Sequence, residues 1–158
     1  MKHFFRYVGL GIGCVLVLLV VYIFGPVLLN NIYVQSFGRT LNDIHHPSES
    51  RLLKRVLAVA NLGLASNQCD YVAGEFRATT LPKKRVEDFY APLVNSTLSL
   101  TAPLTYEIYF AEDADEHWYL GKHSDTLQTY KQKPLSGERV YLFLIVEAHP
   151  PGLDFRCH

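Results

Sequence analysis

The stretch RVYLFLIVE, Arg139–Glu147, carries large apolar side chains at both odd and even positions. A strand with this composition has two apolar faces and is buried on both of them. The sequence HPPG, residues 149–152, then ends the run. We therefore predict a central strand of a sheet, covered on one face by helices. Four candidates remain for what covers the other face: the C-terminal tail, the linker that precedes the domain, a ligand groove or a partner.

Three further stretches predict the neighbouring strands. Residues 70–80 (DYVAGEFRATT) and 104–111 (LTYEIYFA) alternate apolar with polar side chains, which is the period of a half-buried strand. A short apolar run at 117–120 follows the acidic segment EDADE, so 104–111 and 117–120 are interpreted as a hairpin. The sheet is thus expected to have four strands.

Two helices are expected beside the sheet. From Ser48 or Ser50 to Leu64, apolar residues recur at three- and four-residue steps opposite basic ones, as on an amphipathic helix. The second helix follows Thr80, with Pro82 in its first turn and Pro92 limiting its length. This order predicts an α+β domain over residues 48–158: a small, mainly antiparallel four-stranded sheet with two helices on one face.

An apolar segment precedes this domain. Residues 7–29 (YVGLGIGCVLVLLVVYIFGPVLL) contain no charged side chain and, as a helix, would measure about 35 Å, enough to cross a bilayer once. Lys2 and Arg6 precede it and no Lys or Arg follows until Arg39, which predicts a cytoplasmic N-terminus, residues 1–6, and an exported domain. The length favours an uncleaved anchor over a signal peptide. Polar residues 30–47, which include His45 and His46, are interpreted as a linker.

The cysteines support an oxidising compartment. Beyond the membrane segment the chain has Cys69 and Cys157, and such a pair in an exported domain is expected to form a disulfide. Its loop spans most of the domain, and in the chain-entropy model it contributes about 4–5 kcal/mol. A metal pair of Cys157 with His158, or a reactive thiol, are the alternatives.

No stretch carries a catalytic signature. The sequence lacks a Gly-x-Ser-x-Gly elbow and a phosphate-binding loop, and its acidic segment lacks EF-hand spacing. With 15 Lys and Arg against 15 Asp and Glu, it has no basic footprint for nucleic acid. We therefore expect no catalytic residue, cofactor, metal site or nucleic-acid partner. One enzymatic alternative stays open, a membrane-anchored hydrolase using strand carboxylates and a histidine, drawn from Asp70, Glu75, Glu107, Glu147, His117 and His123.

Two groups of residues are candidates for protein contact. Lys83, Lys84 and Arg85 open the second helix, where cations oppose the helix dipole, so they are available to a partner. Trp118 and Tyr119 belong to the side-chain types enriched in interfaces. A solvated basic turn and core aromatics are the respective alternatives. The sequence favours a non-enzymatic accessory module, anchored in a membrane, whose partner is another membrane or envelope protein.

Overall fold

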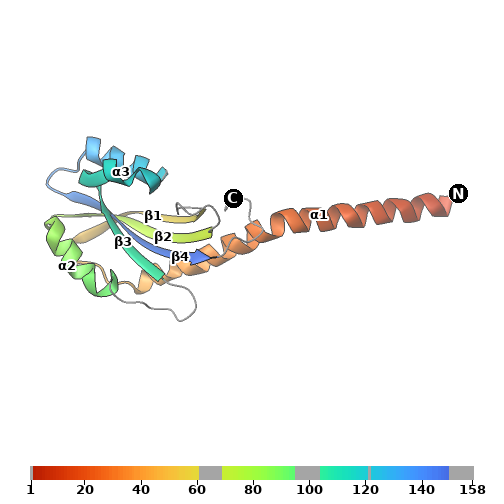
Figure 1. Cartoon of the computed structure of the whole chain (residues 1–158), viewed down its shortest axis with the longest axis horizontal. Helices are drawn as coiled ribbons and strands as arrows, with labels where there is room; N and C mark the ends of the chain where they lie inside the picture. The colour runs from red at the N-terminus through yellow and green to blue at the C-terminus, as the bar shows by residue number, and fades with distance from the viewer. Residues whose placement is uncertain (1, 61–68, 95–103, 121, 150–158) are drawn as a thin grey trace.

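The computed structural model describes residues 2–60, 69–94, 104–120 and 122–149, and these form a long helix followed by an α+β domain (Figure 1). The four strands pair antiparallel throughout, in the order β1-β2-β4-β3. Three helices, α1 to α3, and two 3₁₀ helices, η1 and η2, complete the described chain. The elements are α1 (Lys2–Phe37), η1 (Gly38–Asp43), β1 (Ser50–Ala60), β2 (Cys69–Thr79), α2 (Lys83–Val94), β3 (Leu104–Phe110), η2 (Ala111–Leu120), α3 (Lys122–Gln132) and β4 (Arg139–His149). The predicted α+β class with an N-terminal apolar helix is confirmed.

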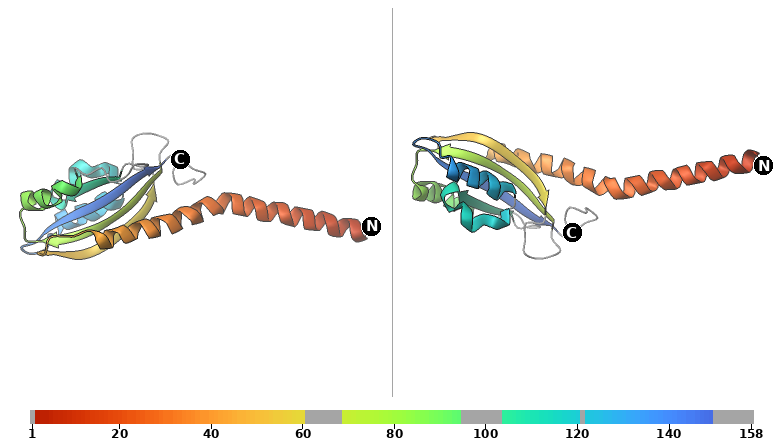
Figure 2. Two further views of the ribbon diagram at one scale, coloured as in Figure 1. Left: turned by 90° about the horizontal axis from the view of Figure 1, so that it is seen from below. Right: turned by 90° about the horizontal axis from the view of Figure 1, so that it is seen from above.

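β4 lies inside the sheet, between β2 and β3, as its doubly apolar sequence predicts. Tyr141, Phe143 and Ile145 project to one face, and Leu142 and Leu144 to the other, all of them buried. The first face packs against α1, η1 and α2, and the second against η2 and α3. The two views of Figure 2 place α1 and α3 on opposite sides of the sheet. Helices therefore cover both faces, and the prediction of helices on one face alone is wrong.

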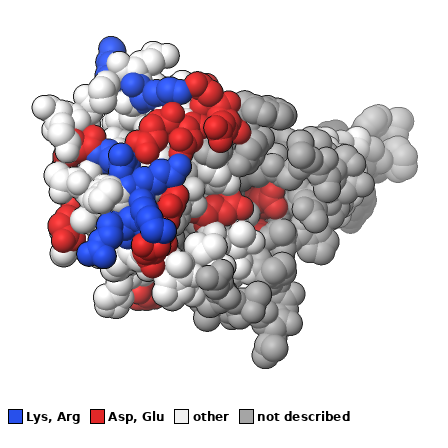
Figure 3. Space-filling model, turned by 60° about the vertical axis from the view of Figure 1, so that its left-hand side comes forward, with Lys and Arg blue, Asp and Glu red and all other residues white. Residues whose placement is uncertain are grey.

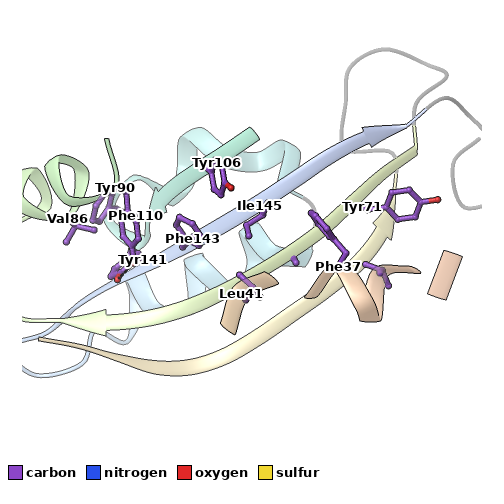
Figure 4. Packing of buried hydrophobic residues seen from close by; sticks show 12 residues of the cluster. Phe37, Leu41, Tyr71, Val86, Tyr90, Tyr106, Phe110, Tyr141, Phe143 and Ile145 are labelled. Atoms are coloured by element: carbon purple, nitrogen blue, oxygen red, sulfur yellow. Dashed lines mark hydrogen bonds between the residues drawn. The ribbon is translucent and has the colours of Figure 1, made fainter. Parts of the chain in front are cut away.

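The predicted linker, residues 30–47, is folded. α1 continues to Phe37 and η1 follows directly, with Val34, Phe37 and Leu41 buried against the sheet. Figure 4 shows Phe37 and Leu41 on the same side of the sheet as Ile145. These three apolar residues follow one another at three- and four-residue steps and form a narrow stripe on one side of the helix. Most of the residues around them are polar, so the segment has the composition of a linker. This segment is the cover that the first face of β4 requires.

The predicted helix at 48–64 is wrong, because Ser50–Ala60 form the edge strand β1. The register of β1 against β2 shifts between Leu52 and Lys54, so this edge strand contains a bulge. Leu53 and Val56 consequently pack into the same apolar cluster although they are three residues apart. A bulge thus imitates the three-residue spacing of a helix, and pairing with β2 determines the actual structure.

The second half of the predicted hairpin is also wrong. Residues 111–120 form η2, and α3 follows, so β1 supplies the fourth strand instead of residues 117–120. Ala111 and Ala114, three residues apart, are buried on the face that α3 covers with Leu127. The second predicted helix is confirmed as α2. In the turn before it, Thr79 Oγ1 accepts a hydrogen bond from the Leu81 amide at 3.1 Å.

Candidate functional site

The end of α1 is joined to the sheet at the point where the apolar run stops. Tyr71 on β2 donates its hydroxyl hydrogen to Asn30 Oδ1 at 2.8 Å, and Tyr33 on α1 donates to Glu147 Oε2 on β4 at 2.8 Å. The rings of Tyr33 and Tyr71 lie 4.7 Å apart between centroids. Asn30 directly follows the predicted membrane segment, so no free spacer separates that segment from the domain.

The outer part of α1 has the properties of a membrane span. Among the described residues α1 is the helix long and apolar enough to cross a bilayer, and the apolar part is not buried in the domain. Figure 1 shows it extending away from the sheet as a rod. The helix bends on the way (Figure 2), and Pro26 is a physical cause for a bend because it lacks the amide hydrogen for its helical bond. Length and composition are therefore compatible with a single-pass or signal-anchor protein.

A hollow of about 410 Å³ lies at this junction. Leu29, Ile32 and Tyr33 of α1 line it together with Tyr71 of β2. Leu29 and Ile32 are well exposed, at 66% and 59%. The junction thus presents apolar and aromatic side chains next to the end of the apolar helix, the composition typical of a membrane interface.

A buried polar cluster lies further from α1, around Glu75 of β2. Its carboxylate, 1% exposed, accepts hydrogen bonds from Arg55 Nε at 2.9 Å and from Arg77 Nη1. Arg55 reaches it from β1, and Arg77 lies two residues along β2 on the same face. A carboxylate removed from water needs such partners, because an unpaired buried charge is costly. Two guanidinium groups against one carboxylate leave the cluster with a positive excess.

His46 links this cluster to α2. Its Nδ1 lies 2.6 Å from the Tyr90 hydroxyl, which is 3.2 Å from the Tyr141 hydroxyl. Nε2 lies 3.2 Å from Glu75 Oε2, but it has no aligned hydrogen-bond partner among the described residues. The negative carboxylate favours the tautomer with its proton on Nε2, so Nδ1 accepts the hydrogen from Tyr90. His46 therefore belongs to the core and not to a linker.

The protonation of His46 is disfavoured. Burial lowers its pKa from 6.5 to about 4, and Arg77 adds to this effect, whereas Glu75 opposes it. Burial, with the neighbouring Tyr141, raises the pKa of Tyr90 well above its ordinary value. Both groups are thus neutral at neutral pH. The arrangement can hold α2 and residues 44–49 on the sheet, but a carboxylate that is 1% exposed is closed to a substrate.

We expect the stability of the domain to depend on pH through His46. Since its pKa is lower in the folded than in the unfolded chain, unfolding takes up a proton between pH 6.5 and about 4. The stabilisation is complete above pH 6.5 and is lost as the pH falls, by up to about 3 kcal/mol near pH 4. Urea unfolding between pH 4 and 7 measures this slope.

The matched controls for that experiment are two glutamine variants. His46→Gln should flatten the slope between pH 4 and 6.5, whereas His45→Gln, at the exposed neighbour, should retain it. An equal slope in wild type and His46→Gln would show that another group carries the pH dependence.

The basic residues predicted for partner contact are placed at the start of α2. Lys83 contacts Asp113 Oδ2 at 2.6 Å and lies 5.2 Å from the centre of the Phe110 ring. The hydrogen bond to Asp113 raises the pKa of Lys83. Lys84 and Arg85 are exposed. Lys83 is therefore partly used inside the domain, and the other two cations face solvent.

The remaining predicted site residues are only partly described. Trp118 and Tyr119 belong to η2, and their side chains lie outside the described residues. Cys69 begins β2 and pairs with His149 at the end of β4, whereas Cys157 lies outside the described residues.

The end of the domain remote from α1 carries interleaved charges of both signs (Figure 3). Three of its ion pairs join separate elements: Arg51 with Glu138, Arg139 with Glu112, and Lys131 with Asp115. Such exposed pairs contribute little to stability, because water screens them. The mixture gives this end no single sign of charge with which to attract an ionic ligand.

The strand carboxylates considered for hydrolysis do not converge. Glu75 and Glu147 project to the α1 face, whereas Asp70 and Glu107 project to the α3 face. Glu75 and Glu147 stand four pairs apart along the β2–β4 ladder, about 13 Å at the rise of a strand. Retaining and inverting glycosidases place their carboxyl groups about 5–9.5 Å apart. Among the described side chains, moreover, no three His, Cys, Asp or Glu gather as metal ligands.

Comparison with known proteins does not add a function. No protein-family model, no curated protein and no solved structure matches the chain.

Proposed function

We propose that this chain is a single-pass membrane protein whose domain is an interaction or accessory module of an envelope complex. In this proposal residues 1–6 lie in the cytoplasm and the domain lies outside it, in the periplasm if the host is bacterial. The observation that carries it is the passage of α1 from an apolar rod into the sheet without a spacer, through Val34, Phe37 and Leu41. A domain held in this way meets partners in the same membrane at a fixed height.

Rigid attachment favours binding in a physical way. A flexible stalk would let the domain sample many orientations, and association would then have to restrict them. Here Asn30, Tyr33, Tyr71 and Glu147 fix the sheet on α1 by hydrogen bonds and ring contact. The orientation of the domain is thus set before a partner arrives, which lowers the entropic cost of binding.

The orientation follows from the charges beside the membrane segment. We expect the domain to be digested by protease added to right-side-out vesicles and to be protected in inside-out vesicles, because Lys2 and Arg6 keep the N-terminus in the cytoplasm. Immunoblotting of both preparations, with detergent-permeabilised vesicles as the control, measures this. Protection in right-side-out vesicles would reverse the proposed topology.

The proposed disulfide between Cys69 and Cys157 is consistent with this compartment. Cys69 opens β2 beside His149, and Cys157 follows His149 by eight residues, so the bond would tie the C-terminus to the membrane-proximal end of the sheet. Its formation is measured by alkylating the protein before and after reduction and weighing it by mass spectrometry.

The function is tested by crosslinking the full-length protein in its native membranes and identifying the linked proteins by mass spectrometry. We expect a discrete set of partners, which the variant Cys69→Ser, Cys157→Ser loses together with its stapled fold. The hydrolase alternative gains no support from the dispersed carboxylates. Absence of any partner, with hydrolytic activity of the purified protein on envelope material, would overturn the proposal in favour of that alternative.

A further inference from the structure

The sheet has two edges, β1 and β3, and they differ in how they are protected. β1 contains the bulge between Leu52 and Lys54 and carries Arg51, Lys54 and Arg55. Bulges and charged side chains are the features by which edge strands avoid pairing with other chains. β3 pairs with β4 in an unbroken register from Leu104 to Phe110, and its sequence contains no Lys, Arg, Pro or Gly. Within the described part of the chain, β3 is therefore the less protected edge.

A hollow of about 440 Å³ lies along this edge, between β3 and α2. It is lined by the consecutive residues 106–109 of β3 and by Glu87, Ala91 and Val94 of α2. Consecutive strand residues project to alternate faces of a sheet, so a hollow that all four line must follow the outer edge of the strand. Figure 1 shows β3 at this edge of the sheet.

The apolar and acidic side chains around this hollow indicate which kind of segment would bind there. On the α2 side the hollow is apolar, with Ala91, Val94 and Ile108, and Val94 is 48% exposed. Two carboxylates flank it on opposite faces of the sheet: Glu87 of α2, which lies 4.0 Å from Lys83, and Glu107 of β3, which projects to the α3 face and accepts the Tyr109 hydroxyl hydrogen at 2.5 Å. A strand added beside β3 would place apolar side chains against α2 and a basic side chain opposite Glu107.

We infer that β3 and α2 form a docking groove for an extended segment of a partner protein, in which apolar residues alternate with Lys or Arg. This inference rests on the proposed interaction function and names the surface that serves it. A second copy of the chain fits less well: in the centred antiparallel pairing of two β3 strands, Glu107 would face Glu107, and like charges directly opposite each other are destabilising.

The test uses the full-length protein in native membranes with a photoreactive phenylalanine at Val94, which lines the groove. The control carries the same group at Leu52, an exposed residue of β1. We expect at least tenfold more crosslinked partner from position 94, with the linked peptide alternating apolar and basic residues. Glu107→Lys should lower that yield at least tenfold, and Glu116→Lys, at an exposed residue of η2 outside the groove lining, should change it less than twofold.

The other outcomes separate this inference from the proposed function. A partner captured from position 52 but not from 94 would overturn the groove and leave the interaction function standing. A crosslink from position 94 to a second copy, or equal yields in Glu107→Lys and Glu116→Lys, would overturn the assignment of a basic extended partner. No partner from either position or from a general lysine-reactive crosslinker would contradict both the groove and the proposed function.

Discussion

Replacing Glu75 by glutamine is expected to lower the free energy of unfolding by about 3 kcal/mol, at the lower end of the range for breaking a buried ion pair. Glutamine preserves the volume of the side chain and removes its charge. Arg77, 12% exposed, and Arg55 then lose their anionic partner. Because glutamine retains one acceptor oxygen in place of two, one of the two guanidinium groups also loses its hydrogen bond. Urea unfolding of the full-length protein in detergent at pH 7, followed by the fluorescence of its single tryptophan, measures the change.

The matched control is Glu138→Gln. Glu138 also pairs with an arginine, Arg51, but this pair lies in solvent, so its loss should lower the free energy of unfolding far less than the loss of Glu75. Equal effects of the two substitutions would mean that the Glu75 cluster is no more important to the fold than a surface pair.

Replacing Leu41 by alanine is expected to cost about 3 kcal/mol. Leu41 is 1% exposed, in η1, and packs with Phe37 and Ile145 in the cluster on the α1 face. Truncation of a buried leucine removes its apolar contacts and leaves a cavity, with typical losses of 2–5 kcal/mol. A residue of a flexible linker would show almost no loss. The same urea titration measures the effect.

Leu52→Ala is the control for that substitution. Leu52 is 44% exposed on β1, so the loss of its side chain should cost less than about 1 kcal/mol. If the two leucine variants were equally stable, the segment after α1 would not be part of the domain core.

The sequence predicts best where its pattern has one interpretation. Residues 140–146 are apolar at every position, which is typical of a strand buried on both faces. β4 occupies such a place, between β2 and β3. The alternation in 70–80 and 104–111 likewise identifies β2 and β3. The start of α2 is predicted from Thr80 and Pro82, whose local chemistry is the same in any fold, and α2 begins at Lys83.

The sequence fails where long-range contacts decide between two interpretations. In β1 the bulge brings Leu53 and Val56 to one face, and only pairing with β2 distinguishes this from a helix. In residues 30–43 the apolar stripe consists of three residues, Val34, Phe37 and Leu41. Packing on the sheet, more than local propensity, stabilises the helical structure of this segment. Local propensity carries no information about the pairing of β1 with β2 or about the packing of residues 30–43 on the sheet.

The candidate site is also set by tertiary structure. Glu75 could be suspected from the strand pattern, but the sequence places His46 and Arg55 twenty residues or more away from it, in segments interpreted as linker and helix. The β1–β2 register brings Arg55 opposite Glu75. The folded segment before β1 brings His46 Nε2 to 3.2 Å from Glu75 Oε2. Arg77 carried the one local signal, since residues i and i+2 of a strand share a face.

The apolar part of α1 continues into the domain without a flexible joint. Hydrogen–deuterium exchange of the full-length protein in lipid nanodiscs tests it at amides 31–41. We predict protection equal to that of β2 and β4, because α1 and η1 are part of the same packed unit. Exchange of these amides within seconds, with β2 and β4 protected, would contradict a rigid junction and with it the basis of the proposed function.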